Sequence, residues 1–198
     1  MLSVYQLKPK FQQLLIPVLN QLHKQQITAN KITMSAIVWS GILGVLLFLS
    51  PKHPIYLLFV AFGLLVRMAL NALDGMMART YDQQSKLGEI LNEIGDIVSD
   101  TIIFCGLLSC TFASTSIVFL FIILSIVNEF AGVLAKIISD TRRYDGPMGK
   151  SDRALLVGLW CVLCFLFPSI NPAFNIIFSV AIFLLILSTY KRLSNSLK

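Results

Sequence analysis

The chain has 198 residues, of which 56% are hydrophobic and only 13% are charged, and its mean hydropathy is +0.78. This composition is typical of an integral membrane protein and argues against a soluble domain. The formal net charge of +6 suits contact with anionic lipid headgroups. Because the basic residues are spread over loops between apolar runs, they indicate membrane topology and not a nucleic-acid partner. We interpret residues 1–198 as a single domain.

Residues 1–27 mix apolar and basic positions and are too polar to cross a bilayer. The pattern predicts an amphipathic helix that lies on the cytoplasmic membrane surface. The alternative is a surface helix packed on the rest of the protein, and the two interpretations are compatible. Pro9 and Pro17 are expected to interrupt this helix.

Six apolar segments follow within residues 28–198, each near the roughly 20 residues that a spanning helix needs. We expect them at residues 31–50, 54–79, 88–112, 115–139, 152–168 and 172–190. The connecting loops alternate between nearly uncharged and rich in Lys and Arg, so both termini are predicted to be cytoplasmic. The expected fold class is an all-α integral membrane protein, a six-transmembrane-helix bundle preceded by an N-terminal amphipathic surface helix.

The stretch from Asn71 to Asp100 concentrates acidic residues at the ends of two apolar segments. A carboxylate buried in lipid costs several kcal/mol unless a partner neutralises it, so this stretch is expected to bind something cationic. At about 100° per residue, one helix face carries Arg67, Asn71, Asp74 and Ala78, and a second carries Glu89, Asn92, Glu93, Asp96 and Asp100. Two polar faces joined by a short loop predict a site with two walls.

The same stretch resembles the signature of the CDP-alcohol phosphatidyltransferases, D-x-x-D-G-x-x-A-R, eight residues, then G-x-x-x-D-x-x-x-D. Here the spacing is kept throughout, and the positions read Asn71, Asp74, Gly75, Ala78, Arg79, Gly88, Asn92 and Asp96. Asparagine replaces the first and third aspartates. A weaker match is the family's Pro-Asn-x-x-Thr element, of which Asn30 and Thr33 are present and the Pro is replaced by Ala29. Thr28 or Asn30 can also simply cap the first spanning helix.

The resemblance implies transfer of a phosphatidyl group from CDP-diacylglycerol to a small alcohol, with release of CMP, in a homodimer of the bacterial inner membrane. It implies Mg²⁺ or Mn²⁺ held by Asn71, Asp74, Asn92 and Asp96, with Asp96 as the general base. Hard cations of this kind prefer carboxylate and carbonyl oxygens. The resemblance also implies a nucleotide site made by Asn30, Thr33, Asp74, Gly75, Ala78, Arg79 and Gly88. Two asparagines in place of aspartates are expected to weaken binding of a second metal ion.

Basic residues gather in the segment 140–153, where Arg142, Arg143, Lys150 and Arg153 lie at one predicted membrane edge. They suit a pocket for a phosphorylated acceptor such as glycerol 3-phosphate, because guanidinium groups match phosphate oxygens. The positive-inside rule explains the same charges without any pocket, and the two interpretations carry similar weight.

Three further charges, Arg67, Asp100 and Glu129, are predicted to lie about 16–18 Å from the cytoplasmic boundary, near the middle of the bilayer. Isolated charges at that depth are costly, so we expect Arg67 to face Asp100, Glu129 or both inside the bundle. The alternative is that each charge lines a water-filled cavity.

Three classes of function compete at this point. The first is the transferase, and the second is a non-catalytic or altered homologue that binds or transports a lipid or nucleotide, because intramembrane charges also mark transport paths. A purely structural role leaves the signature residues unexplained. The Cys161-x-x-Cys164 pair is expected to pack in the membrane and not to form a redox or metal site.

Overall fold

The computed structural model describes residues 8–110 and 113–198, and within these ranges the chain forms helices and loops only. The main helices are α1 (Lys8–Lys24), α2 (Ala29–Leu49), α3 (Ile55–Thr80), α4 (Lys86–Cys105), α5 (Thr115–Ser139), α6 (Lys150–Leu166) and α7 (Phe174–Ser196). Two short 3₁₀ helices, η2 (Gly106–Ser109) and η3 (Pro168–Ala173), follow α4 and α6. The predicted all-α fold is therefore confirmed, and residues 1–7 of the predicted surface helix lie outside the described part.

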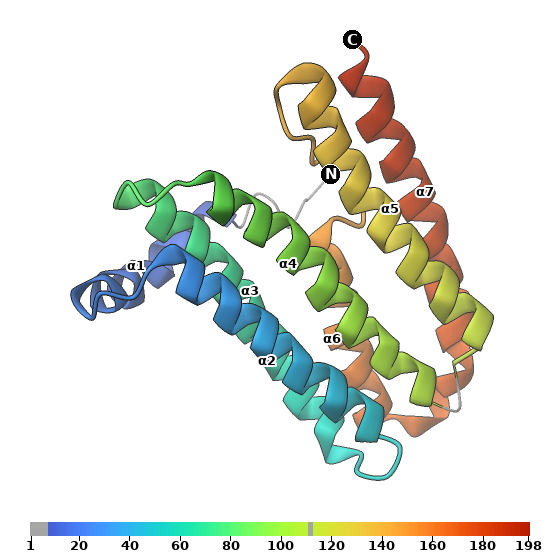
Figure 1. The fold of residues 1–198 in the computed structure, drawn as a ribbon. Coiled ribbons are helices and arrows are strands. Elements are labelled where there is room, and N and C mark those ends of the chain that lie inside the picture. Colours follow the sequence, from blue (N-terminus) through green and yellow to red (C-terminus); the bar gives the residue numbers. More distant parts are fainter. Residues whose placement is uncertain (1–7, 111–112) are drawn as a thin grey trace.

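Helices α2 to α7 run side by side as a bundle, and α1 lies across one end of it (Figure 1). Helix α2 packs on α3 and α4, α3 packs on α6, α4 packs on α5, and α5 packs on α7. The bundle core is apolar and includes a group of aromatic rings, among them Phe104, Phe121 and Phe178. A separate small core joins α1 to the neighbouring ends of α2 and α3.

The α1 helix runs unbroken through Pro17, so the expected interruption there is wrong. Pro9 lies in the first helical turn, where a backbone N–H has no intrahelical partner to lose. The ring of His23 stacks on Tyr81 at a centroid distance of 3.5 Å, and the Tyr81 hydroxyl donates to Asn20. These contacts fix α1 to the end of α3, next to the signature residues.

Helices α2, α3, α5 and α7 are long and apolar enough to cross a membrane. Many of their large apolar side chains face outward, such as Val45, Phe62 and Phe130, as expected of a surface in contact with lipid. The other two predicted spans, α4 and α6, do not meet the same criteria of length and hydropathy, for physical reasons. Helix α4 carries acidic residues along one face, and α6 has only 17 residues before the chain enters η3.

The start of α2 is fixed by two caps. Thr28 is the N-cap, and its side-chain oxygen accepts from the Lys31 N–H, which agrees with one of the two predicted caps. The Gln83 side chain, in the loop between α3 and α4, accepts from the Ala29 N–H at 2.8 Å. The loop between α3 and α4 therefore contacts the start of α2 and holds the ends of the three helices together.

Candidate active site

The two polar helix faces predicted from the sequence meet between α3 and α4. The Asn71 amide donates to Oδ1 of Asp96 at 3.3 Å, which joins the two walls. One turn along α3, Asp74 is 3% exposed, and its Oδ2 accepts from the Thr33 hydroxyl of α2 at 3.0 Å. Three helices thus bring a pair of carboxylates to one place, at the end of the bundle that α1 covers.

Asp96 has a second partner that comes from α6. The ammonium group of Lys150, the first residue of α6, bonds to Oδ2 of Asp96, although the two residues are 54 positions apart. The sequence placed Lys150 only in the acceptor pocket and did not pair it with Asp96. The signal available in the sequence was an aspartate in an apolar stretch, because a buried carboxylate requires a nearby cation or metal ion. In the structure Asp96 is 9% exposed.

The expected nucleotide residues surround the adjoining helix ends. A Cβ atom on Gly88 would lie 2.8 Å from Oδ1 of Asn30, so a larger residue at this position would have to displace the Asn30 side chain. On α3, the Arg79 guanidinium folds back along Gly75, with Nη1 3.2 Å from the position of a Cβ there. Ala78 is half-buried between these positions. The side chains of Arg79 and Asn30 thus lie against the two glycines, and Arg79 adds an exposed positive charge.

The four signature positions offer oxygen ligands, but two of them, Asn71 and Asn92, are uncharged. Within the described ranges, no three His, Cys, Asp or Glu residues gather as a metal-binding group. Asp74 and Asp96 are close enough to interact electrostatically, and Asn71 uses its amide nitrogen, not its carbonyl oxygen, to bind Asp96. Asn92 is half-buried one turn before Asp96. Carboxylate and amide oxygens are the ligands that hard divalent cations prefer, and these positions offer two carboxylates where the family signature has four.

Further into the bundle, the buried charges form ion pairs. Arg67 Nη1 lies 2.7 Å from Asp100 Oδ1, and Arg153 Nη2 donates to Asp100 Oδ2 at 2.7 Å. Arg153 is 0% exposed and also donates to the Met148 carbonyl. The structure therefore places Arg67 against Asp100, and it adds Arg153 as a second cation on the same carboxylate.

Glu129 of α5 belongs to the same network. It accepts from Arg153 and from Arg142, in each case at 2.8 Å, while Arg192 of α7 lies 3.9 Å away. Arg142 also donates to both carboxylate oxygens of Glu93 at 2.7 and 2.8 Å. The sequence did not predict Arg192 or Glu93 as members of this network.

The loop between α5 and α6 owes its shape to α7. Arg192 donates to the Asp145 and Asn128 carbonyls, and Arg143 donates to the Asn195 carbonyl. Gly146 has φ +91°, and a Cβ there would lie 2.7 Å from the backbone of Ser188. The loop that carries Arg142 and leads to Lys150 is thus held against the last helix.

The four cations predicted to bind an acceptor have different surroundings. Arg153 is buried among Asp100, Glu129 and the Met148 carbonyl, and Lys150 is paired with Asp96. Burial acts to lower the pKa of Arg142, but the charges of Tyr144, Glu93 and Glu129 raise that pKa overall. Arg143 has a side chain that is 35% exposed and lies 3.9 Å from Asp145. Most of these charges are therefore matched within the chain.

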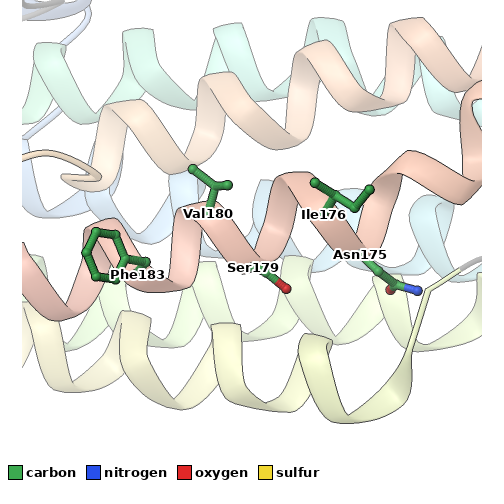
Figure 2. Close-up of a pocket in the computed structure, with 5 residues that line it drawn as sticks. All are labelled: Asn175, Ile176, Ser179, Val180 and Phe183. Atoms are coloured by element: carbon green, nitrogen blue, oxygen red, sulfur yellow. The ribbon is translucent and has the colours of Figure 1, made fainter.

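A shallow open groove lies elsewhere, on the outer side of α7. Figure 2 shows its lining residues, Asn175, Ile176, Ser179, Val180 and Phe183, projecting from successive turns of that helix. The groove is nearly all apolar and contains none of the signature residues. It is not part of the candidate active site.

The comparisons with known proteins agree with this geometry. The model of the CDP-alcohol phosphatidyltransferase family matches residues 26–193. The inner membrane protein YnbA of Escherichia coli (strain K12) is 43% identical over 191 residues, a match that covers 96% of this chain and 94% of YnbA.

Two solved structures of phosphatidylinositol phosphate synthase (PgsA1) from Mycobacterium tuberculosis share the fold. The structure with CDP-DAG bound has a TM-score of 0.73 and 21% identity, and the match covers 91% of this chain and 92% of that one. The complex with manganese and citrate has a TM-score of 0.74 and 20% identity, over 92% of this chain and 88% of that one. The sequence signature, the family match and the fold agree, and the chain belongs to the CDP-alcohol phosphatidyltransferase family.

Proposed function

We propose that this enzyme transfers the phosphatidyl group of CDP-diacylglycerol to the hydroxyl of a small alcohol and releases CMP. The observation that carries this proposal is that α3 and α4, the two helices that carry Gly75 and Gly88, bring Asp74 and Asp96 to one place, where Thr33 and Asn71 contact them. A PgsA1 structure with CDP-DAG bound supports the choice of donor.

We assign the cytidine and pyrophosphate of the donor to the ends of α2, α3 and α4. Asn30, Thr33 and Ala78 line this space together with the two glycines, and Arg79 faces the phosphates from the rim. Backbone N–H groups at the start of α4 add a favourable potential for anionic oxygens. The diacylglycerol chains then extend along the apolar outer surface of the bundle into the lipid.

A divalent cation completes the site in this proposal. Asp74 and Asp96 would bind it, and Asn71 and Asn92 can add carbonyl oxygens. When bound, Mg²⁺ or Mn²⁺ neutralises the pyrophosphate and stabilises the charge that develops during transfer. The PgsA1 complex with manganese and citrate supports a divalent metal in this fold.

Asp96 acts as the general base. Its carboxylate accepts the proton of the acceptor hydroxyl while that oxygen bonds to the phosphatidyl phosphorus, and the bond from phosphorus to the CMP oxygen breaks. Asn71 and Lys150 hold the carboxylate from two sides, so it faces the acceptor in one orientation. The acceptor side of the site is the segment that carries Arg142, Arg143, Lys150 and Arg153, and of these Arg143 and Lys150 are exposed enough to contact the acceptor.

In the membrane, we propose six spans, with α4 and α6 crossing as well as the four apolar helices. The charged face of α4 points into the bundle in this arrangement, and its apolar residues, such as Ile90, Ile94 and Val98, face outward. Both termini and the active site lie on the cytoplasmic side of a bacterial inner membrane, and two copies form a homodimer. The likeness to the inner membrane protein YnbA supports the location.

A second candidate is a non-catalytic homologue that binds or transports a lipid or nucleotide. The pairing of Lys150 with Asp96 favours it, because the ammonium group occupies a carboxylate that a metal ion would need. The two asparagines of the signature point the same way, since they lower the negative charge of the site.

The deciding experiment incubates purified protein with CDP-diacylglycerol, Mg²⁺ or Mn²⁺ and a panel of alcohols, and measures CMP release. The transferase proposal expects CMP release that needs both the metal ion and one class of alcohol. If CDP-diacylglycerol binds but no alcohol elicits CMP release, the non-catalytic candidate is correct. Asn71→Asp should then raise metal affinity, because it restores one carboxylate of the family signature.

A further inference from the structure

Glu129 is an unusual carboxylate because three arginines from separate parts of the chain face it. Arg142 comes from the loop after α5, Arg153 from α6 and Arg192 from α7. Glu129 itself lies in the middle of α5 and is 4% exposed. A cluster of three guanidinium groups is the arrangement that proteins use to hold a phosphate or a carboxylate. In this chain, the anion in the cluster is one of its own side chains.

The remaining cations near the site are also matched by internal carboxylates. Both carboxylate oxygens of Glu93 accept from Arg142, and Asp100 lies between Arg67 and Arg153. Lys150 is bonded to Asp96. Among the described residues of this cluster, the carboxylates of Glu93, Asp96, Asp100 and Glu129 therefore offset all but one of the five positive charges of Arg67, Arg142, Lys150, Arg153 and Arg192.

The deeper part of the cluster is also closed to solvent. The side chains of Arg153 and Arg192 are 0% and 1% exposed. The cavity that Asp100, Glu129 and Arg153 line with neighbouring apolar residues has no room for a water-sized molecule. A phosphate group therefore cannot reach these guanidinium groups unless the Glu129 carboxylate leaves them.

We infer that the acceptor is an alcohol without a phosphate group, and that Glu129 determines this specificity by filling the arginine cluster with its own carboxylate. This inference rests on the proposed function and narrows its substrate class. It departs from one of the two interpretations drawn from the sequence, in which Arg142 and Arg153 belong to a pocket for a phosphorylated polyol.

The physical reason is the free-energy cost of bringing a phosphate group into the cluster or of displacing Glu129 from it. A phosphate that entered the cluster would add negative charge beside Glu129, Asp100 and Glu93, and like charges in a buried site repel strongly. Displacing Glu129 would instead leave a buried carboxylate without its cations. An uncharged alcohol meets neither cost, because it needs only hydrogen bonds from the exposed parts of Lys150 and Arg143.

The first test uses the wild-type enzyme with matched acceptor pairs, glycerol against glycerol 3-phosphate and inositol against inositol 1-phosphate. For each pair in which at least one member is a substrate, we expect a higher kcat/KM for the unphosphorylated member. A second, binding measurement records the thermal unfolding midpoint with and without inorganic phosphate, and the wild type should show no more stabilisation than in sodium chloride of equal ionic strength.

The second test removes the internal anion. Glu129→Gln keeps the shape of the side chain and leaves the arginines with an unmatched charge, so phosphate should now stabilise the protein and inhibit it. Glu93→Gln is a milder variant on the same arginine and should give a smaller gain. Glu89→Gln is the matched control, because Glu89 pairs with Lys136 on an exposed part of the surface and does not contact the cluster.

These measurements separate the inference from the proposed function. If no alcohol elicits CMP release, the proposed function fails, and the phosphate-binding comparison alone decides the role of Glu129. Preferred use of a phosphorylated acceptor by the wild type overturns the inference. Equal stabilisation of the wild type and both variants by phosphate also overturns it, because the cluster would then bind phosphate in spite of Glu129. The absence of stabilisation in all three proteins overturns it too, because the removal of Glu129 would then not open the cluster to phosphate.

Discussion

At the scale of single residues, the surroundings of Asp96 define the chemistry. The Asn71 amide and the Lys150 ammonium group bond to different oxygens of its carboxylate. An aspartate at position 71 would repel Asp96 unless a metal ion lay between them, whereas asparagine binds it directly. In the proposed mechanism, the asparagine thus exchanges part of the metal-binding charge for a fixed orientation of the base.

The first prediction concerns this base. Asp96→Asn should lower turnover by about 10²- to 10⁴-fold, because the amide cannot accept the acceptor proton. Binding of CDP-diacylglycerol should change little. The control is Asp82→Asn, an exposed residue with φ 52°, a conformation that asparagine also adopts well. CMP release and donor binding are the measurements, and unchanged turnover in the Asp96 variant would exclude Asp96 as the base.

The second prediction concerns the close approach of α2 and α4. Gly88→Ala should raise KM for CDP-diacylglycerol by about tenfold, which corresponds to about 1.4 kcal/mol, since the new Cβ would push Asn30 out of position. Gly41→Ala, where nothing lies within 4 Å of the new Cβ, should leave KM unchanged. Equal KM values in the two variants would show that Gly88 has no role in the nucleotide site.

At the scale of elements, α4 is the helix on which the site depends. Its acidic residues Glu93, Asp96 and Asp100 follow one face, and each meets a cation from a different element. Arg67 comes from α3, Arg142 from the loop after α5, and Lys150 from the start of α6. These ion pairs compensate the charge of α4, so a helix with this composition can lie in the centre of a membrane bundle.

The third prediction tests this compensation. Asp100→Leu should destabilise the protein by about 3–5 kcal/mol, because it leaves both Arg67 and Arg153 short of a buried partner. Adding Arg67→Met should recover part of that loss, since it removes one of the two unmatched charges.

The measurement is the free energy of unfolding in mixed detergent micelles. The exposed pair of Lys136 and Glu89 is the comparison, and Lys136→Met should cost less than about 1 kcal/mol. A double variant that is no more stable than Asp100→Leu alone would mean that the Arg67–Asp100 contact does not fix the packing of α3 on α4.

Local patterns made part of the site predictable. Helical periodicity placed Asn71 and Asp74 on one wall and Asp96 on the other, because side chains three or four residues apart share a helix face. Depth counting placed Arg67 level with Asp100, which is where the structure pairs them. The contact of Lys150 with Asp96 was not predictable in this way. It depends on how α6 is positioned by the loop at 140–149, and that loop is held by α7 through Arg192.

At the scale of the whole molecule, the outer surface is apolar and the charges are inside or at the ends. The sequence predicted the helices and their order, and its bounds for α5, residues 115–139, agree with the structure. It did not distinguish the four strongly apolar helices from α4 and α6, because length and hydrophobicity vary gradually along this chain. Only the packing shows that Asp96 and Asp100 of α4 pair with Lys150 and Arg153 of α6.

The fourth prediction concerns the orientation of the bundle. In a variant without its native cysteines, Gln25→Cys and Lys198→Cys should react with a membrane-impermeant thiol reagent from the same side, the cytoplasm. Lys52→Cys, in the loop between α2 and α3, should react from the opposite side. All three positions are exposed. Labelling of Gln25→Cys and Lys198→Cys from opposite sides would contradict an even number of spans between them.

The central claim is that the chain transfers a phosphatidyl group and does not merely bind or hydrolyse the donor. The most direct measurement supplies CDP-diacylglycerol, Mg²⁺ or Mn²⁺ and an isotopically labelled alcohol, and quantifies both CMP and labelled phospholipid. We predict equal amounts of the two products, with neither formed by the Asp96→Asn variant. CMP without labelled lipid, or no CMP with any alcohol, would contradict the claim.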